Sequence, residues 1–309
     1  MNGLRPLLLR LLGIIGIVLV VVSVCFALMH AVPGGPFDDG RDIDPATREN
    51  LLSRYNLNAP LSEQYVRYLD DVFLHFDLGP SLKLRDYSVN EILEESLPVS
   101  MVLGLFAMGF ALLVGLSAGA IAASRRGTWL DTFVMGAATF GLSVPNFVIA
   151  GLLVLLFVFQ WQLFPLVGLQ SAKHLVLPSI ALGLPFAASI ARLFRTGLLE
   201  VLGEDWIRTA RSKGLSPRAV LWRHAAQPAL LPVVSFLGPA LAGILSGSLV
   251  IEQIFAIPGM GSHFVDSALN ADYYLASGVV IIYTVLVSTA NLGVDVLYGL
   301  LDPRIEADT

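Results

Sequence analysis

The sequence predicts an all-α integral membrane protein with six transmembrane helices and a small helical insert between the first two. Hydrophobic residues make up 55% of the 309 positions and charged residues 14%, whereas a soluble domain has about 25% charged residues. Six stretches of at least 18 residues contain no Asp, Glu, Lys or Arg, and a helix needs about 20 apolar residues to cross a bilayer. Residues 33–97 differ, because they hold 13 of the 24 acidic and 6 of the 19 basic residues. The formal charge of −5 therefore combines an acidic insert with a nearly uncharged body.

The apolar windows fix the expected helices in order. They run over Leu11–Phe37, Ser96–Ser124, Thr132–Ala172, His174–Ala191, His224–Ile251 and Tyr273–Val294. The first window follows Arg5 and Arg10 as a signal peptide would, but its apolar run is longer and no A-x-A site follows, so we expect an uncleaved span. The third window is interrupted by Gln160, Pro165 and Gly168, which predicts one helix followed by a short loop.

The Lys and Arg residues of the short loops predict the orientation. With the N-terminus inside, the inner segments hold Arg5, Arg10, Arg125, Arg126, Arg192, Arg195, Arg208, Arg211, Lys213, Arg218, Arg223 and Arg304, while the two short outer loops hold only Lys173. Cytoplasmic loops are enriched in these residues. We therefore expect a multi-pass protein of the plasma (inner) membrane with both termini in the cytoplasm and the acidic insert outside.

The expected domains follow from these spans. Residues 1–32 form the N-terminus and first helix, 33–97 the extracytoplasmic insert, 98–301 the transmembrane core and 302–309 a cytoplasmic tail. Within the insert, Asp44-Pro45 has the pattern of a helix start, and Ser88 and Glu91 have the spacing of a capping box that leads into the second span.

Enzyme motifs are missing or out of context. None of the three lysines follows a glycine, so there is no P-loop, and none of the five histidines forms an H-E-x-x-H zinc motif. Cys25 is the single cysteine. Gly115-Leu116-Ser117-Ala118-Gly119 matches G-x-S-x-G, but it lies inside an apolar span without a base, so we interpret it as a face of small residues on which another helix packs. We expect no catalytic, cofactor or metal site in the chain.

The inner loop over residues 200–227 carries the most information. Acidic residues at 204 and 205 and basic residues at 208, 211 and 213 suit the two ends of a short helix, and Gly214 supplies its stop. Ser216-Pro217 then starts a second helix.

Three interpretations of this loop compete. A helix-turn-helix that binds nucleic acid is disfavoured, because the loop is tethered at both ends beside a bilayer. A basic loop that only obeys the positive-inside rule is the simplest alternative. The third is a protein-docking element, with Trp206, Thr209, Ala210 and Gly214 as the surface that another subunit grips.

The loop resembles a known family. Residues 204–215, Glu-Asp-Trp-Ile-Arg-Thr-Ala-Arg-Ser-Lys-Gly-Leu, look like the EAA loop of the peptide and nickel branch of ATP-binding-cassette importer permeases. Further matches are Val32-Pro33-Gly34, Gly79-Pro80-Ser81, Asp86-Tyr87-Ser88-Val89-Asn90, Ser143-Val144-Pro145, Pro228-Ala229-Leu230-Leu231-Pro232, Gly238-Pro239, Gly247-Ser248, Glu252-Gln253-Ile254-Phe255, Pro258-Gly259-Met260-Gly261, Asn291, Asp295 and Asp302-Pro303-Arg304. The chain is most similar to the B-type membrane subunit of oligopeptide permeases. Its short loop between spans three and four favours this class over dipeptide permeases with a longer insertion there.

The resemblance implies a type I ABC importer permease fold and a set of partners. These are a second permease chain, two cytoplasmic ATPase subunits that bind ATP and Mg, and an extracytoplasmic peptide-binding protein; nucleic acid is not among them. It also implies that the helix around Thr209 to Ser216 is a coupling helix seated in one ATPase. The implied coupling loop comprises Asp205, Arg208, Thr209, Ala210, Arg211, Lys213, Gly214, Leu215 and Ser216.

Polar and bending residues complete the expected site. Ser143, Asn146, Ser235, Ser246 and Ser248 are candidate pore-lining residues because they are polar on apolar spans. Pro178, Pro185, Pro228, Pro232 and Pro239 either place bends that serve as pivots or shape a static bundle. We expect Arg192, Arg195, Glu252 and Asp295 to pair or anchor rather than relay protons.

Two alternatives stay open at this point. The substrate could be a dipeptide, glutathione, a nickel chelate or haem instead of an oligopeptide. An ion-coupled secondary transporter acting alone is also conceivable, although it would be expected to show an internal inverted repeat, and none is evident.

Overall fold

The computed structural model describes residues 4–31, 58–84 and 87–301, and the described part is almost entirely helical. The chain divides into two compact units. Unit 1 contains residues 1–99 and 258–288, and unit 2 contains residues 100–257 and 289–309. The predicted helix start at Asp44-Pro45 and the tail at Asp302-Pro303-Arg304 lie outside the described residues.

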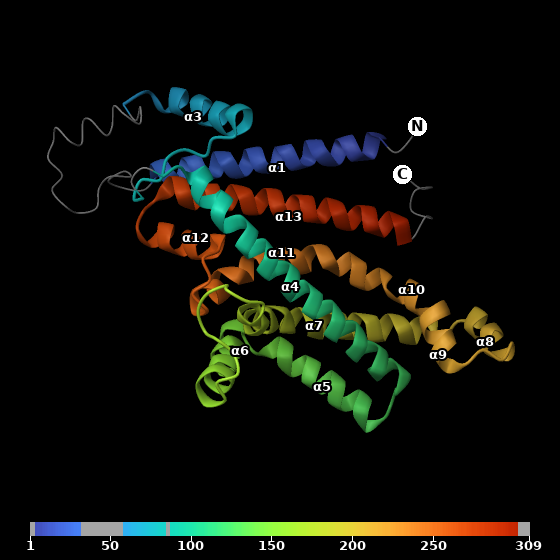
Figure 1. Cartoon of the computed structure of the whole chain (residues 1–309). Coiled ribbons are helices and arrows are strands. Elements are labelled where there is room, and N and C mark those ends of the chain that lie inside the picture. Colours follow the sequence, from blue (N-terminus) through green and yellow to red (C-terminus); the bar gives the residue numbers. More distant parts are fainter. Residues whose placement is uncertain (1–3, 32–57, 85–86, 302–309) are drawn as a thin grey trace. The chain divides into compact units, whose positions relative to one another are not determined.

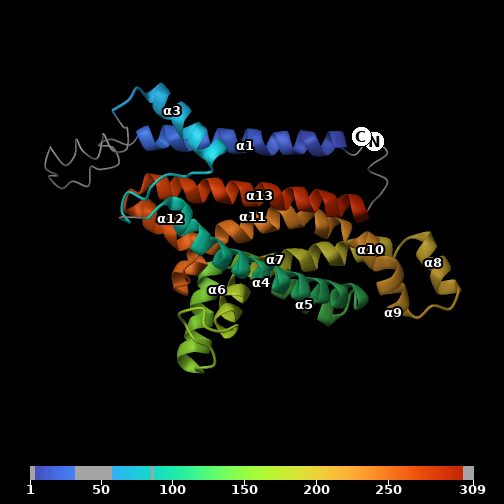
Figure 2. The same ribbon diagram turned by 45° about the horizontal axis from the view of Figure 1, so that its top comes forward.

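Unit 1 contains α1 (Leu4–Ala31), α3 (Leu61–Asp70), a π-helical turn over Asp71–His75 and α12 (Met260–Leu269), and it shares α4 (Val89–Ser124) and α13 (Tyr273–Leu301) with unit 2. α3 lies beside the C-terminal part of α1 (Figure 2). Two tyrosines of α3 attach it there, because Tyr65 Oη and Ser23 Oγ lie 2.7 Å apart and Tyr68 is buried. The predicted capping box is confirmed, because the Glu91 N–H donates to Ser88 Oγ (3.2 Å) and the Ser88 N–H donates to Glu91 Oε2 (2.8 Å).

A buried carboxylate holds the polar loop of unit 1 against the start of α13. Asp272 is 1% exposed and accepts hydrogen bonds from Ser81 Oγ and from the N–H groups of Leu82, Lys83 and Leu275. Four donors compensate the cost of burying the charge. This network ties the described residues after Gly79 to the start of α13.

Unit 2 consists of helices that pack side by side. After α4 come α5 (Trp129–Ser143), α6 (Asn146–Leu153) with a π-helical extension over Val154–Gln160, α7 (Lys173–Val201), α8 (Asp205–Ser212), α9 (Pro217–Ala219), a π-helical turn over Val220–Ala225, α10 (Ala226–Ala229) and α11 (Leu231–Ile254).

Contacts at glycines give the direction of each neighbour of α7. A Cβ at Gly115 would lie 2.7 Å from the carbonyl oxygen of Ala187, and one at Gly119 would lie 2.7 Å from that of Ala191. The residue numbers rise together, so α4 and α7 are parallel. In α11, Gly243 contacts Phe186 while Gly247 lies beside Leu182, so α11 is antiparallel to α7. The predicted small-residue face at Gly115 and Gly119 is therefore confirmed as a helix-packing motif.

The expectation of one helix followed by a short loop in the third apolar window is wrong, because two helices fill it. α5 ends at Ser143, α6 begins at Asn146, and the two axes differ by 104° (Figure 1). The cause is Val144-Pro145, since proline lacks the N–H that would continue the helix and forces the preceding residue into extended backbone; Val144 has ψ 125°. Five described helices are long and apolar enough to cross a membrane, and the bent pair would be a sixth span.

Candidate functional site

The loop between α7 and α11 has the predicted order of elements. α8 begins with Asp205 in its first turn and ends with Arg211 in its last. Gly214 follows in the left-handed region (φ 82°), which glycine adopts at little cost. Ser216 then caps α9 by accepting from the Ala219 N–H at 3.3 Å, with Pro217 at the first helical position. The short helix, glycine turn and second helix predicted from the sequence are confirmed.

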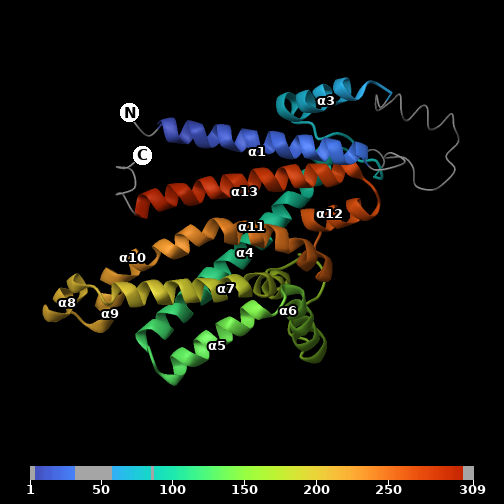
Figure 3. The same ribbon diagram turned by 180° about the vertical axis from the view of Figure 1, so that it is seen from behind.

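The buried face of α8 anchors the loop to the transmembrane helices. Ile207 is fully buried and Ala210 is 8% exposed, and Ile207 belongs to one apolar cluster with Phe194 and Leu198 of α7 and with Val220. Burial of such side chains contributes about 1.5–3 kcal/mol each. A rigid link therefore runs from α8 into α7 (Figure 3).

The opposite face of α8 is exposed in the part of the chain that the structure describes. Trp206 is 45% exposed, and the side chains of Arg208, Thr209, Arg211, Ser212 and Lys213 are exposed. Arg208 lies 3.1 Å from Asp205, but both side chains are largely solvated, so this ion pair contributes little stability. The expectation that Ala210 belongs to the gripping surface is wrong, because the residue points into the core.

The residue range of α8 differs from the range of the coupling helix that the resemblance implied. The resemblance placed a helix around Thr209 to Ser216, whereas α8 covers Asp205–Ser212 and Lys213 to Ser216 form the turn. The positive φ of Gly214 explains the early end, since a residue in that region closes a helix. Gly214 and Leu215 are exposed in that turn.

The five candidate pore-lining residues differ in exposure. Ser143, Ser235 and Ser246 are exposed, and each hydroxyl donates to a carbonyl of its own helix. Asn146 is half-buried at the start of α6, and its Nδ2 would lie 3.2 Å from a Cβ at Gly247 of α11. Ser248 is 1% exposed and bonds Leu245 O at 2.7 Å, so its assignment to a pore surface is wrong: packing within the chain encloses it.

The ionisable groups near the span ends fall into two kinds. Arg195 pairs with Asp131 through two hydrogen bonds of 2.7 and 2.8 Å, which confirms a structural pairing. Glu252 is fully buried and accepts from Ser100 Oγ at 2.8 Å. Arg192 and Asp295 are exposed on the chain.

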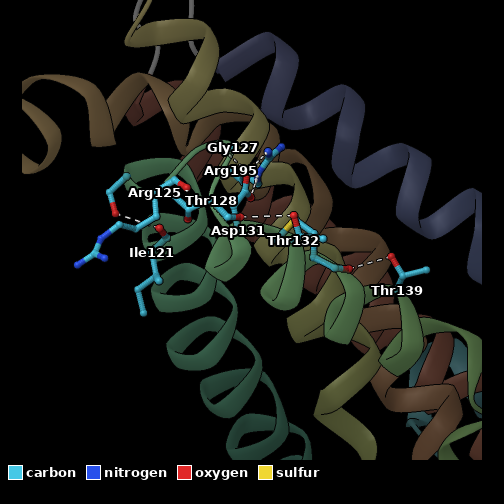
Figure 4. A network of polar contacts seen from close by, with 10 residues as sticks. Ile121, Arg125, Gly127, Thr128, Asp131, Thr132, Thr139 and Arg195 are labelled. Carbon is cyan, nitrogen blue, oxygen red and sulfur yellow. Dashed lines mark hydrogen bonds and ion pairs between the residues drawn. The ribbon is translucent and has the colours of Figure 1, made fainter.

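The sequence analysis missed Asp131. It accepts from the Gly127 N–H at 3.0 Å as well as from Arg195, and it is 5% exposed (Figure 4). A search for uncharged windows places this residue just outside the third window. The sequence did offer a signal for this pair. An acidic residue lies in the first turn of one apolar helix and an arginine lies near the end of a later apolar helix, and such ionisable groups tend to pair.

One exposed group offers atoms that a cation could use. Ligand atoms of Asp70, Asp71 and His75 lie within 4.8 Å of one another. His75 also pairs with Asp70 (3.5 Å) and Arg67 with Asp71 (3.9 Å). These partners account for the cluster without an ion.

The fold and the loop together define a class of protein: a multi-pass membrane protein with a structured polar loop rigidly joined to its spans. Two family models match this chain. The family described as binding-protein-dependent transport system inner membrane component matches residues 115–307, and its N-terminal counterpart matches residues 3–102. The chain belongs to this family and is a permease component of a transport system.

Curated relatives align over nearly the whole chain. The dipeptide transport system permease protein DppB of Bacillus subtilis is 45% identical over 94% of both chains. The oligopeptide transport system permease protein OppB of Salmonella typhimurium is 43% identical over 98% of this chain and 99% of its own.

A solved structure shares the fold. A chain of the MetNI methionine ABC transporter in inward-facing conformations superposes with a TM-score of 0.59 at 18% identity, covering 68% of this chain and 96% of its own. This confirms the predicted fold class.

Proposed function

We propose that the chain is the permease subunit of an ATP-driven importer for oligopeptides and that the α8 loop couples it to a cytoplasmic ATPase. The observation that carries the proposal is the two-sided α8, with Ile207 fully buried against α7 and Trp206 45% exposed beside a row of exposed polar side chains. A helix that is fixed on one face and open on the other suits the transmission of a push from another subunit.

The partners and orientation belong to the same proposal. A second permease chain completes the pore, two ATPase subunits bind ATP and Mg, and an extracytoplasmic binding protein delivers the peptide. Residues 1–32 provide the first span, 33–97 an outer insert, 98–301 the core and 302–309 an inner tail, and both termini are cytoplasmic. Relatives whose names specify oligopeptide transport support the substrate class.

A dipeptide is the second candidate substrate, favoured by the 45% identity to a dipeptide permease. Uptake of labelled peptides by a strain lacking the chain, with and without its restoration, separates the two. We expect restored uptake of peptides of three to five residues, on the order of ten times the background. Restoration of dipeptide uptake alone would assign the chain to dipeptides.

Purification tests the assembly. The tagged chain, extracted from its native membrane, is expected to bring with it two ATPase subunits and a second permease. A chain that purifies alone and transports without ATP would overturn the proposal and support the ion-coupled alternative.

A further inference from the structure

The α8 loop packs on α7 through the apolar cluster that contains Ile207. α7 in turn packs closely on α4 and α10. A Cβ at Gly119 would lie 2.7 Å from Ala191 O, and one at Gly197 would lie 2.8 Å from Ala229 O. At such distances there is no room for the backbones to slide. The inner ends of α4, α7 and α10 therefore form one body with α8.

The contact of α5 with α7 is different in kind. Apart from Asp131, the buried residues of α5 are the small Ala138 and Gly141, and a Cβ at Gly141 would meet Leu184 and Ala188 only at ordinary distances of 3.7 and 3.8 Å. The packing of α5 on α7 therefore has no backbone contact at Gly141 as close as those at Gly119 and Gly197.

The Asp131–Arg195 ion pair joins α5 to α7 by polar contacts in addition to this packing. Arg195 Nε donates to Asp131 Oδ1 (2.7 Å) and Nη2 donates to Oδ2 (2.8 Å), so the two planar groups are locked in one orientation. The Gly127 N–H also donates to Oδ2 (3.0 Å), which joins the turn between α4 and α5 to the same carboxylate (Figure 4). The side chains are 7% and 25% exposed, so water competes poorly.

The Asp131–Arg195 pair lies between the cluster that holds α8 and the bent pair α5–α6. Arg195 lies six residues before the end of α7 and one residue after Phe194, which shares a cluster with Ile207 of α8. Asp131 lies in the first turn of α5, which leads to the break at Val144-Pro145 and to α6. α6 itself packs on α7 and α11, so the ion pair fixes the other half of the bent pair, α5, to α7.

We infer that Asp131 and Arg195 are positioning residues that make α5 move with the α8 loop, so that an ATPase movement reaches the bent pair α5–α6. The inference rests on the proposed function. The competing explanation is that the pair serves folding alone. The two explanations predict different effects of breaking the pair. If the pair serves folding alone, fewer transporters assemble, whereas if it serves coupling, each assembled transporter imports less peptide per ATP hydrolysed.

The test uses the complete transporter in proteoliposomes with its binding protein and a peptide substrate. The variants are Asp131→Asn, Arg195→Gln, Arg195→Lys and the double variant Asp131→Asn with Arg195→Gln, which leaves no charge unpaired. Thr132→Val is the matched control, since that hydroxyl is exposed next to Asp131 and donates to the Thr128 carbonyl of its own turn (3.4 Å). Assembled complex, ATP hydrolysis and peptide uptake are measured on each preparation.

We expect the single neutral variants to hydrolyse ATP within about two-fold of the wild type but to import about five-fold less peptide per ATP. We expect the double variant to recover part of the wild-type ratio of peptide imported to ATP hydrolysed, and Thr132→Val to keep the full ratio. An unchanged ratio in Arg195→Lys and in the double variant would overturn the inference, whatever their yield. Failure of every pair variant to assemble would assign the pair to folding and overturn it too.

A second readout does not depend on the substrate. Spin labels at Thr132 and at Glu204, the residue before α8, both exposed, are introduced into a Cys25→Ser background. In the wild-type complex the distance between the labels should stay the same with and without ATP, whereas Asp131→Asn should broaden its distribution. A wild-type distance that changes with ATP overturns the inference. Failure of the wild type to import peptide, with the distance constant, contradicts only the proposed substrate.

Discussion

Gly214 shows how one residue sets the geometry of the loop. Its φ of 82° is unfavourable for residues with a Cβ, but a Cβ there would meet no atom within 4 Å. A substitution therefore acts through backbone strain of about 1–2 kcal/mol and not through a clash. We expect Gly214→Val to lower peptide uptake, while Gly214→Asn, a residue that tolerates this region, retains most of it. Equal loss in both variants would show that the side chain, and not the backbone, matters.

Adjacent residues of α8 should behave in opposite ways. Ala210 is buried and Thr209 is exposed. Ala210→Asp would bury a carboxylate at a cost of at least about 2 kcal/mol and loosen the loop, whereas Thr209→Asp should leave it folded and weaken ATPase binding. Limited trypsin digestion at the basic residues of the loop reports folding, and recovery of the ATPase on the tagged chain reports binding. Resistant Ala210→Asp protein would contradict the observed burial.

At the scale of elements, glycines decide how closely helices approach. A Cβ at Gly119 would meet the backbone of α7, whereas one at Gly109, about three turns earlier on the same helix, would meet nothing within 4 Å. Gly119→Leu should lower the stability of the purified chain by about 1–3 kcal/mol through overpacking, and Gly109→Leu should be neutral. Thermal unfolding in detergent measures both. A stable Gly119→Leu variant would mean that α4 and α7 can separate without loss.

The same scale shows what the sequence could predict. Helix ends were accessible, because caps such as Ser88 with Glu91 and Ser216 with Pro217 act locally. The break before Pro145 was missed because a search for uncharged windows records hydropathy and not the path of the backbone. The burial of Ala210 and Ser248 and the pairing of Asp131 depend on neighbours far along the chain. Side-chain type alone does not encode those neighbours.

At the scale of the whole molecule, orientation and span number are linked. Because α4 and α7 are parallel, we predict that the chain between them returns across the membrane and that the bent pair α5–α6 is a crossing and not a re-entrant hairpin. In a Cys25→Ser background, we expect a cysteine at Thr209 to react with an impermeant maleimide only from the cytoplasmic side and one at exposed Ser171 only from outside. Both should react after permeabilisation. Labelling of both positions from the same side would mean that the bent pair does not cross, and the reverse pattern would mean that the twelve inner basic residues do not set the orientation.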